Sequence, residues 1–254
     1  MHGCFSAMRA ILVKEINQFL SHLVGYISLI IFWVVCALFL FIFPDTSLLN
    51  AGYATLDELF ILAPWFFLFF IPALTMRSFA EEYRSGTMEL LFTKPLTHAQ
   101  IILGKYLACV VLMIIALLPT LMYAFTIRHF TDPGVSLDWG GIVGSYIGLI
   151  LLGSAFTAIG IWTSSLTANT VVAFLLALFV GFLFYFGFDA LSRLPAWQGT
   201  LDYYVQMIGI QFHYQSISRG VVDTRDVIYF LSVIFFFLYL TALNLKYRFT
   251  ELHG

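Results

Sequence analysis

Six long apolar stretches, almost free of charged residues, constrain this chain more than any other feature. They cover about residues 23–43, 59–76, 100–127, 140–162, 170–189 and 226–245. A helix that crosses a bilayer needs ~20 apolar residues. Only 10% of the residues are charged, against roughly 25% in a soluble domain. The sequence therefore predicts an all-α membrane protein, with six transmembrane helices in one transmembrane domain that spans residues 1–254.

The charged residues in the connecting segments predict the orientation. If the N-terminus is cytoplasmic, the inner segments hold eight of the Lys and Arg residues and the outer segments hold four. Nine Asp and Glu residues then fall outside and five inside. Because cytoplasmic loops are enriched in Lys and Arg, we expect both termini in the cytoplasm. The formal net charge of −2 gives no basic surface for nucleic acid, so no nucleic-acid partner is expected.

Residues 5–22 precede the first span and have an amphipathic pattern. Apolar residues recur there at steps of three and four: Phe5, Met8, Leu12, Ile16, Phe19 and Leu20. Charged and amide residues take the other side, which predicts a helix lying in the membrane interface against lipid. The alternative is a simple extension of the first span. The aromatic-rich stretch 190–225 predicts short interfacial helices, in which His213 is interpreted as a packed histidine.

The segment 77–99, between the second and third spans, is a charged island in an apolar chain. Its charged residues are Arg77, Glu81, Glu82, Arg84, Glu89 and Lys94. Gly86 permits a sharp reversal and Pro95 ends helical structure, so two short helical pieces are predicted. A solvated loop is the plain alternative. The exposed edge of Leu90, Leu91 and Phe92 favours a helix that docks onto a cytoplasmic partner.

Gly140, Gly144 and Gly148 recur every four residues in the fourth span. Small residues at this spacing let two helix backbones approach closely. The pattern fits packing inside the six-helix bundle, and it also fits an interface with a second subunit.

The known catalytic patterns are absent from the sequence. The pair Gly104-Lys105 is followed by tyrosine, whereas a phosphate-binding loop needs Ser or Thr there. Nucleophile-elbow and zinc-protease motifs are also missing, and no acidic residue sits at the centre of a span. We therefore expect no enzyme activity, no cofactor and no metal site, and we expect the energy source to be another chain.

Two motifs resemble the ABC-2 type permeases of ABC transporters. The first is Arg77-x-x-x-Glu81-Glu82-x-Arg84-x-Gly86-Thr87-x-Glu89-x-Leu91, followed by Pro95 and by Ile101-Ile102-x-Gly104-Lys105-Tyr106. The second is Ser218-Arg219-Gly220-Val221-Val222-Asp223-x-Arg225-Asp226-Val227-Ile228. These features are most similar to the gliding-motility-associated permease subunit, and next to the permease of the copper-maturation transporter that serves nitrous oxide reductase.

The resemblance implies a dimer of permeases, with a second copy or a paralogue, in the bacterial inner membrane. Each permease would bind a cytoplasmic ABC ATPase through a coupling helix in the loop 77–99. The residues that carry this role by resemblance are Glu81, Glu82, Arg84, Gly86, Thr87, Glu89 and Leu91. The carboxylates would meet basic groups on the ATPase, and the expected activity is export.

The alternative function is a membrane anchor or mechanotransducer, which passes ATPase motion to a periplasmic partner and transports nothing. Both functions use the same sequence features. They differ in whether a path for substrate exists between two copies of the chain.

Overall fold

The protein is described by a computed structural model. It covers the backbone of residues 2–48, 55–88, 96–130, 137–195, 199 and 201–253, and the side chains of these except 2–7 and 249–253. Glu89 and Leu91, two of the predicted coupling residues, lie outside the described residues.

Six helices in the described part of the chain are long and apolar enough to cross a membrane. They are built from α2 (Leu23–Ala37), α3 (Asp57–Thr75) with α4 (Ala80–Ser85), α6 (His98–Leu117) with α7 (Leu121–Phe130), α8 (Trp139–Leu166), α9 (Thr170–Phe182) with α10 (Phe188–Ser192), and α13 (Thr224–His253). The described residues contain no strand. The prediction of an all-α protein with six spans is confirmed.

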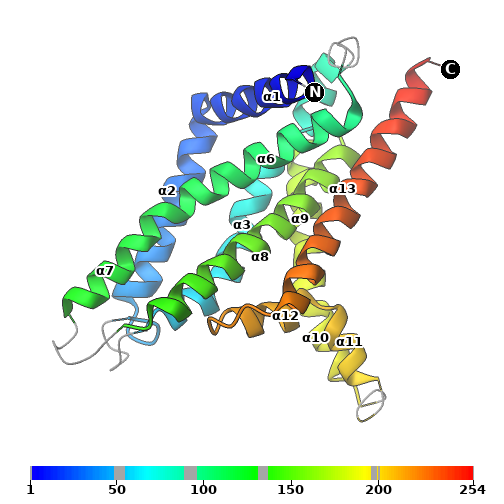
Figure 1. Ribbon diagram of the computed structural model, residues 1–254. Helices are drawn as coiled ribbons and strands as arrows, with labels where there is room; N and C mark the ends of the chain where they lie inside the picture. The colour runs from blue at the N-terminus through cyan, green and yellow to red at the C-terminus, as the bar shows by residue number, and fades with distance from the viewer. Residues whose placement is uncertain are drawn as a thin grey trace.

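Three further α-helices in the described part of the chain lie outside the spans. They are α1 (His2–Ser21), α11 (Asp202–Ile208) and α12 (Ile210–Ile217). Figure 1 shows α1 lying across the ends of the spans, near both chain termini. The backbone at His22 is extended (φ −96°, ψ 137°), so α1 does not continue into α2. The alternative that these residues extend the first span is thereby excluded.

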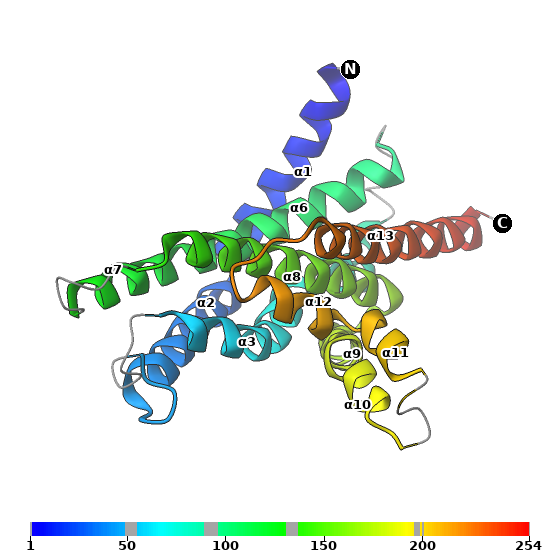
Figure 2. The same ribbon diagram turned by 60° about the horizontal axis from the view of Figure 1, so that its bottom comes forward.

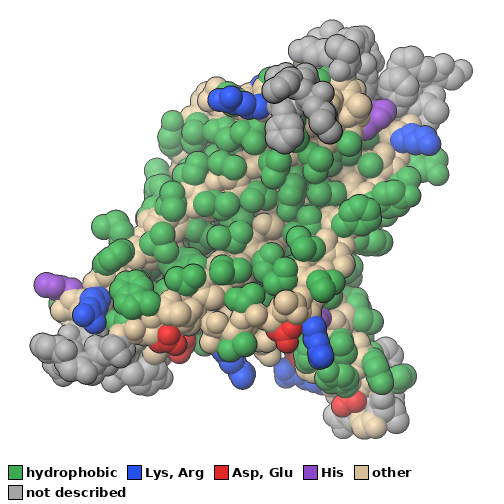
Figure 3. Space-filling view, viewed as in Figure 1, with side chains coloured by type: hydrophobic (Ala, Val, Ile, Leu, Met, Phe, Trp, Pro, Cys, Tyr) green, Lys and Arg blue, Asp and Glu red, His purple; other side chains and the backbone are tan. Residues whose placement is uncertain are grey.

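The two ends of the bundle differ in what they carry. Figures 1 and 2 show α10 and α11 projecting from the end opposite to α1. On the face drawn in Figure 3, apolar side chains cover the middle, and charged side chains gather toward the two ends. This distribution is that of a surface facing lipid, because charged groups are costly in the bilayer. We call the end with α1 and both termini the α1 end.

Helix α8 is the centre of the bundle and packs against α3, α6, α9 and α13. Small residues make this possible. A Cβ at Gly160 would overlap the side chain of Thr75 on α3, so the two backbones approach more closely than larger residues would permit.

The spans that begin with α6, α8 and α9 each start at a residue whose side chain caps the helix. Thr97 and Gln100 form a reciprocal capping box at the start of α6. The side chain of Asp138 accepts a hydrogen bond from the amide of Gly141 in α8, and Asn169 accepts from Val171 and Val172 in α9. These side chains satisfy amides that have no partner inside the helix.

Two backbone carbonyls near prolines in the spans accept hydrogen bonds from side chains of other helices. Pro64 cannot donate to the carbonyl of Phe60. The hydroxyl of Tyr214 on α12 donates to that carbonyl at 2.7 Å. Near Pro119, the indole of Trp33 donates to the carbonyl of Ala116 at 2.9 Å. The predicted interfacial helices in 190–225 are present as α11 and α12, and Tyr214 ties α12 to α3.

Candidate functional site

The predicted coupling segment lies at the α1 end, where α3 turns into α4. Helix α4 ends at Gly86, whose φ of +68° is left-handed. No atom lies within 4 Å of a Cβ built there, so the backbone conformation alone favours glycine. The predicted break near Ser85 and Gly86 is confirmed.

The end of α4 is presented to water. Arg84, Ser85, Gly86 and Thr87 are exposed, and Met88 is buried. The hydroxyls of Ser85 and Thr87 lie 2.9 Å apart and share a hydrogen bond. We call residues 84–87 the tip. Of the predicted coupling residues that the structure describes, Arg84, Gly86 and Thr87 belong to the tip.

The sequence predicted that Glu82 points outward, but its side chain points into the chain. Its side chain is 10% exposed, and its Oε1 lies 2.9 Å from Nζ of Lys105 on α6 and 3.0 Å from Nζ of Lys14 on α1. The physical reason is that Lys105, 1% exposed, is itself buried and needs anionic partners. Glu82 therefore pairs inside the chain, and the carboxylate expected to meet an ATPase is turned inward.

Lys105 is the centre of a four-residue charge cluster, made of Lys14, Glu15, Glu82 and Lys105. Its ammonium lies 2.7 Å from Oε1 of Glu15 and donates to the carbonyl of Ser78 at 2.7 Å. Partial burial lowers the pKa of Lys14, but the carboxylates of Glu82 and Glu15 outweigh this and raise the pKa above its ordinary value. The cluster joins α1, α4 and α6.

A hydroxyl on α8 holds the start of α4. The amides of Phe79 and Ala80 donate to Oγ of Ser164 at 3.0 and 3.2 Å. The Ser164 hydroxyl in turn donates to the carbonyl of Met76 at 3.1 Å. Ser164 therefore caps the turn between α3 and α4 from another helix.

Helix α13 reaches the same site from the other side. The guanidinium of Arg248 lies over the ring of Tyr83 on α4, 4.4 Å from its centroid. Arg248 also donates to the last carbonyl of α8, at Leu166, at 2.6 Å. With these contacts, α4 is bonded to α1, α6, α8 and α13.

Sequence reasoning missed Lys105 and Ser164 as members of this site. A signal for Lys105 was present, since a lysine inside an apolar run requires a partner. Its neighbour Gly104 explains why the partner is α1. A Cβ at Gly104 would lie 2.8 Å from Cγ2 of Ile11, so glycine admits α1 against α6 and Lys105 then bonds to it.

The glycine series of the fourth span packs mainly inside the chain. A Cβ at Gly144 would overlap the carbonyl oxygen of Gly220, in the turn before α13, and a Cβ at Gly148 would lie 2.6 Å from Ile217 on α12. Gly140 meets only the side chain of Asp138, at 3.4 Å. Of the two predicted roles, Gly144 and Gly148 fit packing within the bundle.

This difference gives a matched pair of variants. Gly144→Ala is expected to lower the free energy of unfolding by about 1–3 kcal/mol, because the added methyl group forces the Gly220 turn aside. Gly140→Ala is expected to be neutral or slightly stabilising, because its methyl group has room and alanine favours a helix. Thermal unfolding in detergent checks both, and equal effects of the two variants would contradict the assignment.

The opposite end contains a buried His–Asp contact that the sequence did not predict. Nδ1 of His213 lies 2.7 Å from Oδ1 of Asp226, and its Nε2 lies 2.9 Å from the carbonyl oxygen of Met207. Both ring nitrogens therefore have a hydrogen-bond partner inside the chain. It stacks on Tyr229, with ring centroids 3.8 Å apart. This pair ties α12 to the start of α13.

Among curated proteins, none matches the sequence significantly. A family model described as "ABC-2 family transporter protein" matches residues 9–251, which includes α4, the charge cluster and all six spans. The chain therefore belongs to the ABC-2 transporter family.

Proposed function

We propose that this chain is the permease subunit of an ATP-driven exporter, and that a separate cytoplasmic ATPase docks on the tip. Members of this family generally pair with such an ATPase and have no catalytic activity of their own. The observation that carries the proposal is the set of contacts that α4 makes. Its tip faces water, while its other contacts bond it to four helices. A docked subunit that moves the tip therefore moves the bundle.

The proposal includes an orientation. The α1 end is cytoplasmic, in line with the Lys and Arg residues of its segments, and both termini lie at this end (Figure 1). The membrane is the bacterial inner membrane, where a cytoplasmic ATPase has access to the tip.

The working unit in this proposal is a dimer with a second copy or a paralogue. The least buried spans include those built on α2, α9 and α13. Their exposed side chains include Val34, Val171, Phe179, Phe235 and Tyr239. These faces supply apolar surface for lipid and for a second permease. The motif at 218–228 favours the subfamily of permeases that serves gliding motility.

Docking is tested by charge changes at the tip. Arg84→Glu combined with Thr87→Arg is expected to lower co-purification of the ATPase about tenfold or more, because mismatched charges at an interface cost several kcal/mol. Lys246→Glu on α13 is the control, since Lys246 is exposed and lies outside the tip. Membrane insertion and yield should stay unchanged in both. Full recovery of the ATPase with the tip variant would refute the docking role.

Orientation is tested by labelling single cysteines in intact cells. Cys36 and Cys109 are buried, and Cys4 is replaced by serine. Ser85→Cys at the tip is expected to react with a membrane-impermeant maleimide only after the cells are opened. Ser216→Cys, exposed on α12 at the opposite end, should react from outside. The reverse pattern would overturn the orientation.

A further inference from the structure

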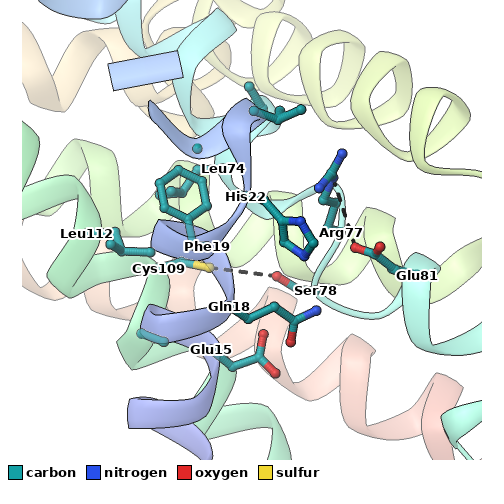
Figure 4. A pocket seen from close by; sticks show the side chains of 14 residues that line it. Glu15, Gln18, Phe19, His22, Leu74, Arg77, Ser78, Glu81, Cys109 and Leu112 are labelled. Carbon is teal, nitrogen blue, oxygen red and sulfur yellow. Dashed lines mark hydrogen bonds and ion pairs between the residues drawn. The ribbon is translucent and has the colours of Figure 1, made fainter. Parts of the chain in front are cut away.

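A small cavity lies at the bend between α1 and α2, where His22 turns the chain (Figure 4). Its polar wall is formed by Glu15, Gln18, His22, Arg77 and Glu81. The remaining wall is mostly apolar and comes from α1, α2, α3 and α6. Figure 4 shows the two kinds of side chain on different sides of the cavity.

The cavity is too small for a whole lipid and suits the end of a headgroup. Its volume is about 40 Å³. One water-sized group needs roughly 10–15 Å³ by the same measure. The cavity therefore takes a group of about three non-hydrogen atoms, which is the size of an aminoethyl group.

One wall of the cavity carries an acceptor without a donor. Oε2 of Glu81 is hidden from solvent and accepts no hydrogen bond from the described residues. Its ion pair with Nε of Arg77 is long, at 3.9 Å. A buried acceptor without a partner is costly, and an ammonium group has three donors and no acceptor. Glu15 lines the same cavity, and although its Oε1 already accepts from Lys105, it adds a second carboxylate to the wall.

The position of the cavity identifies the source of that ammonium. Helix α1 lies across the span ends (Figure 1). An amphipathic helix in that position meets lipid headgroups, so we place the cavity at their level. Arg77 and His22 offer nitrogen donors for a phosphate beside it. Since carboxylates and these donors occur together, the wall suits a zwitterion better than an anion.

We infer that this cavity binds the primary ammonium of an aminophospholipid headgroup. Glu81 and Glu15 face the ammonium, and Arg77 and His22 face the phosphate. A trimethylammonium headgroup is too bulky and has no N–H to donate, and a glycerol headgroup brings no cation. The bound lipid connects α1 with the turn that leads into α4. This inference does not depend on ATPase docking.

The test uses the purified, delipidated chain in detergent micelles. Phosphatidylethanolamine, phosphatidylcholine and phosphatidylglycerol with the same acyl chains are titrated, and binding is followed by native mass spectrometry. Phosphatidylethanolamine is expected to bind about tenfold more tightly than the other two, the size expected of a charge-assisted hydrogen bond. Glu81→Gln should remove this preference and leave the affinities for the other lipids unchanged.

Two variants keep the result specific. Glu58→Gln, the same change at the far end of the span built from α3 and α4, should keep the preference. Ala73→Met fills the cavity without changing a charge and should abolish the preference. Thermal unfolding without lipid verifies that each variant is folded. Equal binding of the three lipids, or an unchanged preference in both Glu81→Gln and Ala73→Met, would overturn the inference. Soluble phosphoethanolamine that binds as tightly as the lipid would overturn the assignment to a membrane lipid.

Discussion

Lys105→Met is expected to destabilise the protein by about 3–5 kcal/mol, the cost of breaking a buried ion pair by removing one partner. The side chain of Lys105 is 1% exposed, and its ammonium lies within 3 Å of Glu15 and of Glu82. Methionine fills a similar volume but leaves both carboxylates with Lys14 as their remaining cation in the cluster. The midpoint of thermal unfolding in detergent measures the loss, and stimulation of the ATPase in the reconstituted complex should fall with it.

Two further variants separate charge from volume. Lys14→Met removes a cation from the same cluster, but its side chain is 54% exposed, so a loss of about 1 kcal/mol or less is expected. The triple variant Lys105→Met, Glu15→Gln and Glu82→Gln removes the uncompensated charges and should recover part of the stability. If Lys105→Met were no more harmful than Lys14→Met, the cluster would not hold α4 in place.

His213→Leu is expected to have the second large effect, about 3 kcal/mol or more, because two buried acceptors lose their partner at about 1–3 kcal/mol each. The substitution leaves Asp226, whose side chain is 9% exposed, without its hydrogen-bond partner. It also removes the donor to the carbonyl of Met207 and the ring stacked on Tyr229. Since the pair ties α12 to α13, limited proteolysis should cut the α11–α12 region faster, and the midpoint of thermal unfolding should fall.

An exposed histidine gives the control for this second prediction. His129→Leu on α7 is expected to change the stability by less than about 0.5 kcal/mol, as surface substitutions usually do. Combining His213→Leu with Asp226→Asn should be milder than His213→Leu alone, because no unpaired charge is then buried. A double variant that is as unstable as the single one would show that ring packing, and not charge, dominates.

The sequence predicts the spans and the break at Gly86 because these are local properties. Apolar length sets a span, and a left-handed turn sets the position of glycine. The partners of Glu82 are different, because Lys105 and Lys14 come from other helices and meet the carboxylate only through tertiary packing. The same holds for Tyr214 and the carbonyl of Phe60, which lie far apart in the chain.

The glycine series shows a second limit of sequence reasoning. A spacing of four places Gly140, Gly144 and Gly148 on one face of α8, whichever helix covers that face. Only the position of the turn at Gly220 decides that Gly144 faces its own chain. His213 shows the same limit. The sequence predicts a packed histidine there, but it does not identify the partner Asp226, which lies on the next helix.

The charge cluster sums to zero, since its two ammonium groups balance its two carboxylates. Moving one elementary charge through a transmembrane voltage of 100 mV involves about 2.3 kcal/mol. A displacement that carries Lys14, Glu15, Glu82 and Lys105 together transfers no net charge. The electric field across the bilayer therefore does no net work on these four groups when they move together, on energised and de-energised membranes alike.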